Sequence, residues 1–319
     1  MYYNLLMSQT STAAGILRIG SRGSPLALVQ ARQAQTALAK ACGVPPGEIE
    51  IKIIRTSGDK IQDRPLADAG GKGLFTKEIE EALQSGAIDF AVHSSKDIPA
   101  LLPGGLTLAA FLPREDPRDA LVSAKAKTLG DLPGNARVGT SSPRRQALLK
   151  RARPDLHIVP LRGNVETRLH KIDAGDMDAA VLAVAGLKRL GLFSAIATAL
   201  DVDEFLPAAG QGAIAIETRA DDAKAVALAA AVNDSDTHIA LAAERAFLAA
   251  LGGSCRTPIA GHARLDGETL NFRGLVAKTD GSDAIEVSRQ GRRADAAALG
   301  ADAGNEIKRR AGADLFVED

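Results

Sequence analysis

The chain has 319 residues, and its 39 lysines and arginines balance 39 aspartates and glutamates, so the formal net charge is zero. With 45% apolar and 24% charged residues it has the composition of an ordinary globular protein, which argues against large-scale disorder and against a surface built as a whole for nucleic acid. The length is sufficient for two or three domains, each with its own core.

Targeting and redox signals are sparse. Residues 1–15 lack the basic start and apolar core of a secretory signal, and no run reaches the about 18 apolar residues of a membrane span. We expect this segment to be a disordered tail and the protein to have no membrane partner. Cys42 and Cys255 are too few for a disulfide framework and favour a reducing compartment, the cytoplasm.

The first folded segment is predicted at Ile16–Gly20, a short apolar strand that leads directly into a helix. Ser24 and Pro25 are suited to the N-cap and first position of that helix. Arg22 precedes them, at a helix N-terminus where free N–H groups favour anions, although a solvated arginine in a turn is the alternative. Cys42 stands at the helix end, where packing is a better explanation than reactivity.

A second strand is predicted at Glu48–Arg55, where isoleucines alternate with polar residues. A long loop follows and ends in the glycine-rich run Gly70–Phe75, before a helix from about Thr76 to Gln84. The loop lacks the spacing of a phosphate-binding Walker motif. We interpret it as a flap in which Lys72 and Phe75 could close over a flat anionic ligand, with a flexible connector as the alternative.

The apolar strand Ile88–Val92 delivers the turn His93–Pro99 at its carboxyl end, the edge at which open α/β sheets bind ligands. The proline stiffens this turn, so that Ser94, Lys96 and Asp97 are held on a rigid corner. A fixed carboxylate beside a lysine suits general acid catalysis or the stabilisation of positive charge. An ordinary surface ion pair is the alternative.

The proline-bracketed, charged segment Leu112–Arg118 is typical of a domain boundary. Beyond it strands and helices alternate, which predicts a parallel sheet with helices on both faces. The predicted strands are Ala136–Gly139, Leu156–Leu161 and Ala179–Val184, and the predicted helices are Pro143–Arg151 and Val165–Asp173.

Positive charge is concentrated in this second unit. From Arg137 to Arg168 there are seven arginines and one lysine against two acidic residues. The turns Gly139–Arg145 and Leu161–Asn164 both join a strand to a helix, so they place arginines at one end of the sheet. Because arginine suits two-point binding of carboxylates and phosphates, we predict a polyanionic ligand. A solvated basic face is the alternative.

Cys255 lies in the glycine-rich turn Leu251–Pro258. Arg256 places a positive charge beside the sulfur and favours the nucleophilic thiolate, so Cys255 could carry a covalently bound group. A lone cysteine is more often an inert apolar residue.

Taken together, these motifs resemble the porphobilinogen deaminase family, also called hydroxymethylbilane synthases. The resemblance runs from Arg18 to about Pro258 and is weak beyond it. It is carried by the cysteine turn and by Ser21–Ala27, Gly70–Phe75, Ala91–Pro99, Arg114–Ala120, Val138–Gln146, Leu161–Val165, Ala183–Gly191 and Pro207–Ala213.

The resemblance implies an α/β fold with two domains like type II periplasmic binding proteins, a ligand cleft between them and a smaller C-terminal α+β domain. The chain would cross between the first two domains at Leu112–Arg118 and at Leu206–Gln211, and Ala213–Ile216 would return to the first sheet. The expected domains are 16–112 with 213–232, 113–212, and 233–319, the last of which carries Cys255. Its expected elements are a helix from Thr237, strands from Ile259 to about Val287 and a helix near Ala294–Arg310.

The family's activity is implied in the same way. Four porphobilinogen molecules would be added stepwise to a dipyrromethane that is joined to Cys255, each with loss of ammonia. Hydrolysis would then release hydroxymethylbilane for tetrapyrrole and heme synthesis. The resemblance further implies a monomeric transferase.

The resemblance also implies roles for single residues. Asp97 would be catalytic and serve the pyrrole nitrogens. The cofactor would be bound by Lys96, Ser94, Arg144, Arg145, Ser142, Arg168 and Arg189. The substrate would be bound by Arg22, Ser24, Arg162, Lys72, Phe75 and Gln211. Asp68, Ser95 and Pro143 depart from the family's usual lysine, large apolar residue and leucine.

Other classes of protein stay open from the residues alone. A two-lobed binding protein for a small anion would share the basic cleft. A cysteine enzyme of acyl transfer would need a histidine base near the thiol, which the sequence cannot place. Nucleic-acid binding is disfavoured by the presence of only two tyrosines and no tryptophan. The five histidines show no metal-ligand spacing, so no metal is predicted.

Overall fold

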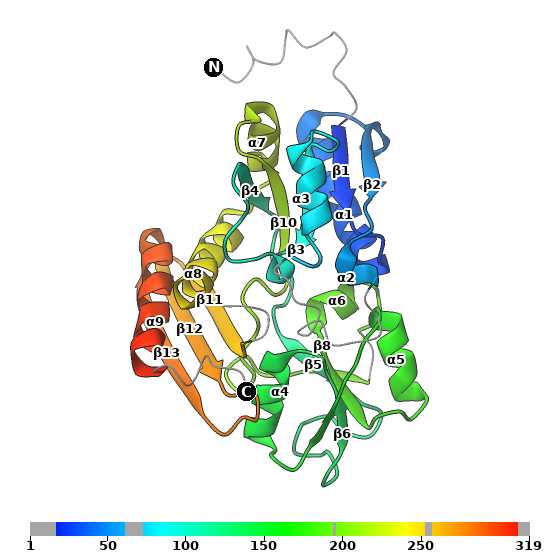
Figure 1. Cartoon of the computed structure of the whole chain (residues 1–319), viewed down its shortest axis with the longest axis vertical. Coiled ribbons are helices and arrows are strands. Elements are labelled where there is room, and N and C mark those ends of the chain that lie inside the picture. The colour runs from blue at the N-terminus through cyan, green and yellow to red at the C-terminus, as the bar shows by residue number, and fades with distance from the viewer. Residues whose placement is uncertain (1–16, 61–72, 194–195, 253–256, 312–319) are drawn as a thin grey trace.

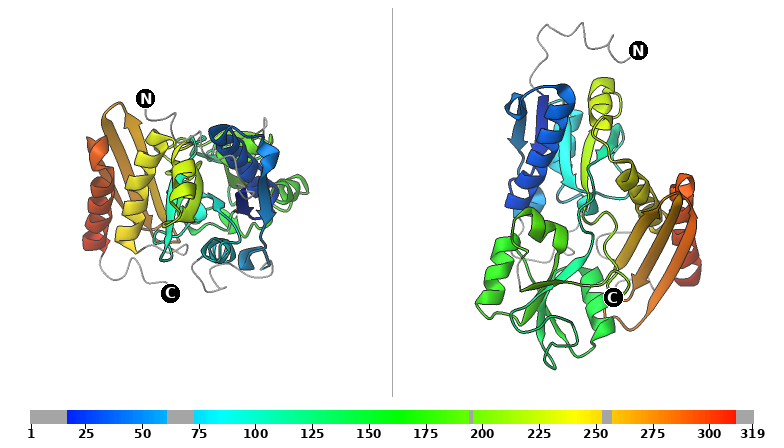
Figure 2. Two further views of the ribbon diagram at one scale, coloured as in Figure 1. Left: turned by 90° about the horizontal axis from the view of Figure 1, so that it is seen from above. Right: turned by 180° about the vertical axis from the view of Figure 1, so that it is seen from behind.

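The computed structural model describes residues 17–60, 73–193, 196–252 and 257–311. Figure 1 shows three lobes, the first above the second and the third beside both, and Figure 2 shows the same lobes from above and from behind. The predicted tail, Asp68, Lys72 and Cys255 lie outside the described residues.

The first lobe is built on a five-stranded sheet in the order β2-β1-β3-β10-β4. Its strands are β1 (Leu17–Ser21), β2 (Ile49–Ile53), β3 (Phe90–Ser94), β4 (Leu106–Phe111) and β10 (Ile214–Arg219). Its helices are α1 (Pro25–Cys42), α3 (Lys77–Gln84) and α7 (Ala223–Ala230), with the short helices η1 (Pro46–Glu48) and α2 (Ser57–Lys60). Helices α1 and α7 share one apolar core with the sheet, and α3 belongs to another.

The start of α1 follows the predicted capping. Ser24 is the N-cap, and its Oγ accepts a hydrogen bond from the Ala27 N–H at 3.3 Å, while Pro25 occupies the first helical position. At the other end Gly43 has φ +69°, the left-handed conformation that suits glycine. These local signals confirm the predicted strand, turn and helix and thereby place Arg22 in the turn.

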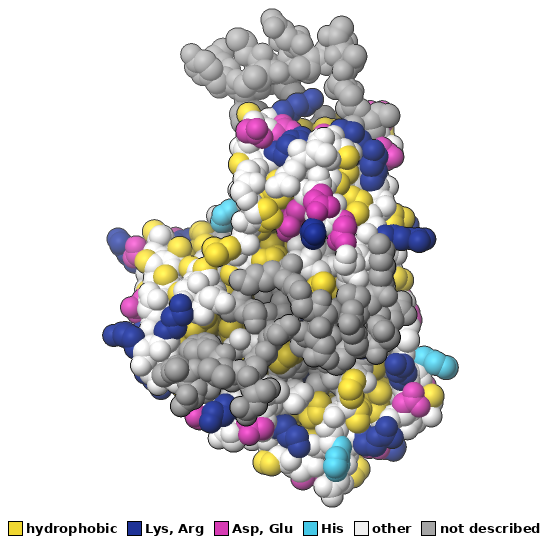
Figure 3. Space-filling view, viewed as in Figure 1, with side chains coloured by type: hydrophobic (Ala, Val, Ile, Leu, Met, Phe, Trp, Pro, Cys, Tyr) yellow, Lys and Arg dark blue, Asp and Glu magenta, His cyan; other side chains and the backbone are white. Residues whose placement is uncertain are grey.

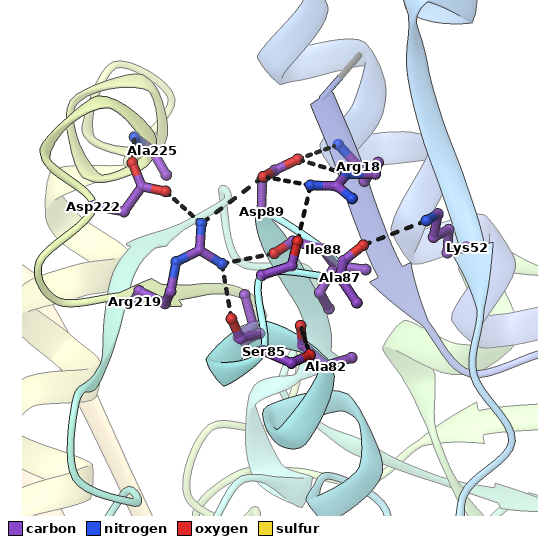
Figure 4. A network of polar contacts seen from close by, with 12 residues as sticks. Arg18, Lys52, Ala82, Ser85, Ala87, Ile88, Asp89, Arg219, Asp222 and Ala225 are labelled. Carbon is purple, nitrogen blue, oxygen red and sulfur yellow. Dashed lines mark hydrogen bonds and ion pairs between the residues drawn. The ribbon is translucent and has the colours of Figure 1, made fainter. Parts of the chain in front are cut away.

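Strand β10 comes late in the chain, and a polar network fixes it in the first sheet (Figure 4). Arg219 at its end donates to the carbonyl oxygens of Leu83 and Ile88, each at 2.8 Å. Arg18 of β1 binds Asp89, with its backbone N–H donating to Asp89 Oδ2 at 2.8 Å. The returning segment is therefore bound to the elements that precede β3, as well as to the strands beside it.

The second lobe has a five-stranded sheet in the order β7-β6-β8-β5-β9. Its strands are β5 (Asp119–Val122), β6 (Arg137–Gly139), β7 (His157–Val159), β8 (Ala179–Ala183) and β9 (Ala197–Ala199). Its helices are α4 (Pro143–Ala152), α5 (Val165–Asp173) and α6 (Val184–Arg189). The predicted alternation of strands and helices is confirmed.

The three strands predicted in this lobe are parallel, as expected, but the complete sheet is mixed. Strand β6 is parallel to β7 and β8, but β5 runs antiparallel to β8 and β9. In the first sheet β10 is likewise antiparallel to β3 and β4. The physical reason is that β5 and β10 enter directly from the other lobe, without the helical crossover that makes successive strands parallel.

The third lobe is a three-stranded antiparallel sheet, β11-β12-β13, packed against two helices. Its elements are α8 (Ser235–Leu251), β11 (Ile259–Asp266), β12 (Thr269–Ala277), β13 (Ala284–Arg292), η3 (Arg293–Asp295) and α9 (Ala296–Ala311). Its core holds Phe247 and Phe272, with ring centroids 5.0 Å apart. The predicted α8, the alternating strands and the last helix are confirmed.

The chain passes between the first two sheets twice, between Phe111 and Asp119 and between Ala199 and Ile214. Both predicted crossings fall within these intervals, and the predicted two-lobed α/β fold class is confirmed. The exact domain limits stay a prediction.

Glu244 of α8 joins both passages to the third lobe. Its carboxylate is fully buried and lies 2.7 Å from Nη1 of Arg114, which belongs to the first passage. It also accepts hydrogen bonds from the N–H groups of Gly210, in the second passage, and Ala263, at 2.6 and 2.8 Å. Burial opposes the charge, but Arg114 and His262 outweigh it and lower the pKa of Glu244 to about 2.

Glu244→Gln is expected to lower the free energy of unfolding by about 2 kcal/mol, because a charged acceptor is lost while its buried donors remain. Since the folded pKa lies below the usual 4.5, this stability is present above pH 4.5 and is lost as the pH falls through about 2. Urea denaturation at pH 7 and at low pH measures both effects. An equal loss for Glu286→Gln, a half-exposed carboxylate of the same lobe, would contradict the specific role of Glu244.

Candidate active site

The corner that carries Asp97 is held from both sides. Ser94 ends β3, and Ser95–Asp97 form the short helix η2, which Ile98 closes by donating its N–H to the Ser95 carbonyl at 3.2 Å. Gly210 lies against this turn with φ +75°, and a Cβ built there would be 2.8 Å from Ser95 Oγ. The corner is therefore closed by its own hydrogen bond and packed against the second passage.

A small pocket opens at this corner in the first lobe. Its lining includes Asp97, Ser94, Arg22, Ser24 and Phe75. The structure thus brings together five predicted site residues from three separate stretches of the chain.

One partner in this pocket was missed by sequence reasoning. Gln30 of α1 is buried, and its Nε2 donates to Ser94 Oγ at 2.8 Å. Gln30 also lines the pocket. The sequence did place Gln30 about one and a half turns into the helix that follows the turn with Arg22. A single glutamine at that position, however, belongs to no motif that would mark it as a site residue.

In the second lobe, Arg144 and Arg145 follow the N-cap Ser142 in the first turn of α4. Both are buried, with 5% and 7% of their surfaces exposed. Arg145 Nη2 lies 2.7 Å from Asp119 Oδ1, and Arg144 Nη2 lies 2.8 Å from Asp119 Oδ2. Arg144 also donates to the Leu206 carbonyl at 2.8 Å. The two guanidinium groups are thus already partly occupied, which the interpretation of two forks aimed at a ligand did not anticipate.

Asp119 is the main functional residue that sequence reasoning missed. Burial of the carboxylate opposes its charge, but Arg144, Arg145 and Lys96 outweigh this effect and lower the pKa of Asp119 to about 2. The residue lies inside a segment that carried the family resemblance, as the first residue of the short strand β5. That position was the available signal.

Lys96 connects the two lobes. Its Nζ donates to Gln211 Oε1 at 3.0 Å, and Gln211 Nε2 donates to the Pro117 carbonyl at 2.7 Å and to Asp119 Oδ1 at 3.1 Å. Desolvation and nearby Arg145 lower the pKa of Lys96 to about 8. Lys96 is solvent-exposed, yet it lies close enough to Arg144, Arg145, Asp97 and Asp119 for their charges to act on it.

Arg168 completes the cluster from α5. Its Nε donates to the Gly163 carbonyl at 2.9 Å. Desolvation, Arg145 and Arg162 lower its pKa to about 10, while Asp97 acts in the opposite direction. The charges of the Asp97 corner and of both arginine turns therefore act on Arg168.

Arg189 lies at the end of α6, half-buried, and its Nη2 donates to the Gly212 carbonyl at 2.8 Å. Desolvation lowers its pKa. It is thus bound to the second passage.

The excess of basic residues counted from Arg137 to Arg168 is larger than the number that gather near Asp97, because some of them pair elsewhere. Arg151 pairs with Glu286 of the third lobe at 2.8 Å, and Arg153 pairs with Asp155 at 2.8 Å. On the face shown in Figure 3, the described basic and acidic side chains are interspersed. The positive excess is therefore local: among the described residues, Lys96, Arg144, Arg145, Arg162 and Arg168 influence one another's charge, and Asp97 and Asp119 are the carboxylates that act on them.

This excess fits a ligand with several carboxylates. Lys96 and Arg168 have lowered pKa values because they are desolvated near other cations, and Arg144 Nε is buried without a hydrogen-bond partner among the described residues. An anionic ligand would relieve the repulsion and supply acceptors. Within residues 17–60, 73–193, 196–252 and 257–311, no three His, Cys, Asp or Glu side chains come together as metal ligands. None of the described helices combines the length and apolarity of a membrane span.

Comparisons with known proteins find relatives over nearly the whole chain. Residues 17–227 match the family model of the porphobilinogen deaminase dipyrromethane cofactor binding domain, and residues 238–309 match the model of the porphobilinogen deaminase C-terminal domain. The porphobilinogen deaminases of Nitrobacter winogradskyi and Nitrobacter hamburgensis are each 59% identical over 97% of this chain and 98% of their own. Among solved structures, the methionine-binding protein MetQ covers 70% of this chain and 91% of its own at 19% identity, with a TM-score of 0.41.

Proposed function

The chain belongs to the porphobilinogen deaminase family, and from this premise we propose how its side chains divide the reaction. Four porphobilinogen molecules are joined head to tail with loss of ammonia, and hydrolysis releases hydroxymethylbilane. The protein is therefore a transferase of tetrapyrrole and heme biosynthesis.

The observation that carries the proposal is the cationic cluster opposite Asp97. Each porphobilinogen brings an acetate and a propionate, so the negative charge of the bound chain rises at every addition. A site for this chain needs many cations with fixed directions, and arginine provides them in a fork that matches a carboxylate. The cluster formed by Lys96, Arg144, Arg145, Arg162 and Arg168 supports this assignment.

Dipyrromethane, when bound, supplies the two pyrrole rings and the free end to which porphobilinogen is added. We propose that Cys255 holds it covalently and that its carboxylates and ring nitrogens are bound by other residues. These are Lys96, Ser94, Ser142, Arg144, Arg145, Arg168 and Arg189. The buried Arg144 and Arg145 would contribute through the guanidinium nitrogens that Asp119 leaves free.

Asp97 is the proposed catalytic residue. It lines the pocket of the first lobe, and its negative charge acts on both Lys96 and Arg168. A carboxylate at this corner can accept a hydrogen bond from a pyrrole N–H and stabilise the positive charge that develops on the ring. It can also take up the proton that is released when two rings are joined.

The incoming porphobilinogen is proposed to occupy the pocket beside Asp97. Support comes from Arg22 and Ser24 in its lining, which offer a cation and a hydroxyl to a carboxylate. The full proposed set is Arg22, Ser24, Arg162, Lys72, Phe75 and Gln211. Because Gln211 is buried and bound to Lys96, its proposed contribution is through the position of that ammonium.

We also propose that the protein acts in the cytoplasm as a monomer, without nucleic acid or membrane as partner. The balanced charge and the two cysteines support this proposal.

Single changes Arg144→Leu, Arg145→Leu, Arg162→Leu and Arg168→Leu are expected to block cofactor assembly or to stop elongation at distinct chain lengths, because each arginine meets a different carboxylate of the growing chain. Intact mass of the protein after exposure to limiting porphobilinogen shows where each variant stops. Arg151→Leu is the matched control, since Arg151 lies in α4 but pairs with Glu286. Normal elongation by all four variants would show that these arginines do not bind the growing chain and serve only the folded structure.

A further inference from the structure

Arg22 is held in one orientation by two contacts. Its Nε and Nη2 both donate to Asp59 Oδ1, at 3.1 and 2.5 Å. The Phe75 ring lies against its face, with the guanidinium carbon 4.1 Å from the ring centroid. Asp59 holds one edge of the planar guanidinium and Phe75 covers one face. The guanidinium therefore cannot turn within its plane or tilt out of it without losing one of these contacts.

Asp59 is itself fixed. It lies in α2, and its Oδ2 accepts hydrogen bonds from the Thr56 hydroxyl at 2.9 Å and from the Thr56 N–H at 3.3 Å. Thr56 is fully buried. Burial of Asp59 opposes its charge, but Arg22 and Thr56 outweigh this effect and lower its pKa, so the carboxylate is ionised at neutral pH.

The backbone of α2 lies directly against Phe75. Gly58 donates its N–H to the Leu74 carbonyl at 2.7 Å, and a Cβ built at Gly58 would be 2.4 Å from the Phe75 ring. Only glycine allows this approach. The carboxylate and the ring that hold Arg22 thus belong to one packed unit.

Among the described residues, the remaining edge of the Arg22 guanidinium makes no hydrogen bond. A guanidinium has five N–H donors in a rigid fork. Asp59 accepts from Nε and from one N–H of Nη2, which leaves the second N–H of Nη2 and both N–H groups of Nη1 on the other edge. Arg22 lines the pocket together with Ser24 and Asp97, whereas Asp59 does not. We propose that Asp59 is a positioning residue, which holds Arg22 so that its two terminal nitrogens bind one carboxylate of porphobilinogen at two points.

The inference assigns Phe75 a second task beyond a flap. Its ring supports the guanidinium face in the described structure. The positioning role of Asp59 rests on the proposed role of Arg22 in substrate binding, and it predicts the direction in which KM changes when Asp59 is removed. If Asp59 competed with the substrate for Arg22, its removal would lower KM, whereas a positioning role requires KM to rise.

The test uses protein that carries its cofactor, verified by intact mass. Asp59→Ala is expected to raise KM for porphobilinogen about tenfold, because one charge-assisted contact is no longer oriented, and to change kcat by about twofold or less. The KM of Asp59→Asn should lie between those of the parent protein and Asp59→Ala, since an amide oxygen still accepts a hydrogen bond from Arg22 Nε. Asp302→Ala is the control, because Asp302 pairs with Arg289 in the third lobe at 2.6 Å, and it should leave KM unchanged.

A double-mutant cycle separates positioning from a general structural effect. Arg22→Lys removes the fork, so Asp59→Ala should add nothing to KM in that background. Multiplying effects in the double variant, or an unchanged or lowered KM for Asp59→Ala alone, would overturn the inference. If Arg22→Lys itself left KM unchanged, the proposed role of Arg22 would fail first, so the two failures are distinguishable.

Discussion

Cys255→Ala is expected to give a protein with the mass of its sequence alone and with no measurable turnover. The parent protein should exceed its sequence mass by one dipyrromethane under denaturing conditions, because the bond to sulfur is covalent. Intact mass and hydroxymethylbilane formation measure the two effects separately. An unmodified preparation with full activity would contradict the assignment of Cys255.

Cys42→Ala is the matched control for this experiment. Cys42 stands at the end of α1, half-buried, and burial raises the pKa of its thiol although Lys224 acts against the rise. A thiol with a raised pKa is a poor nucleophile at neutral pH. The variant should therefore keep both the added mass and the activity.

The cofactor should also stabilise the fold, since a group held only by the native state shifts the unfolding equilibrium. Melting of apo and holo protein compares the two states directly. Equal melting temperatures would argue against this linkage without affecting the mass result.

Asp97→Asn is expected to lower turnover about a hundredfold or more, the usual cost of removing one preorganised charged group. The shape is kept, but the carboxylate that stabilises developing positive charge is lost. The neighbouring Lys96 and Arg168 would at the same time lose the charge that favours their protonated forms. Asp97→Glu keeps the charge but moves it by one methylene, so it should be impaired and still clearly more active than Asn.

Turnover of these variants must be measured on protein that already carries the cofactor, because a variant that cannot assemble it would be inactive for another reason. Intact mass identifies the loaded fraction. If loaded Asp97→Asn turned over at near the parent rate, Asp97 would be removed from catalysis and would remain as one charge of the cluster.

Local chemistry made much of the fold predictable. Ser24, Pro25 and Gly43 define the ends of α1 through side-chain and backbone preferences that act within a few residues. Asn164 does the same for α5, whose predicted range was confirmed without change. The parallel direction of β6, β7 and β8 followed from the alternation of strands and helices, whereas the antiparallel direction of β5 and β10 did not, since these strands are oriented by the passages between lobes.

In the candidate site, too, residues in local sequence motifs were predicted, whereas residues that depend on contacts between distant segments were not. The corner with Asp97 and the two arginine turns were found in the sequence, because strands that end at one sheet edge bring their following turns together. Asp119 and Asp59 were missed as site residues. They bind arginines that are 26 and 37 residues away in the chain, and no local pattern connects those positions.

The sequence by itself determined the helices and strands, the family with its thiol, carboxylate and arginines, and the need for an anionic ligand, since these depend on local preferences and on side-chain chemistry. Only the tertiary structure decided which of those arginines lie near Asp97 and Lys96 and which carboxylates hold them. The reason is physical. The direction of a guanidinium and the charge state of its neighbours depend on burial and on contacts between distant segments, as Asp119 beneath Arg144 and Arg145 shows.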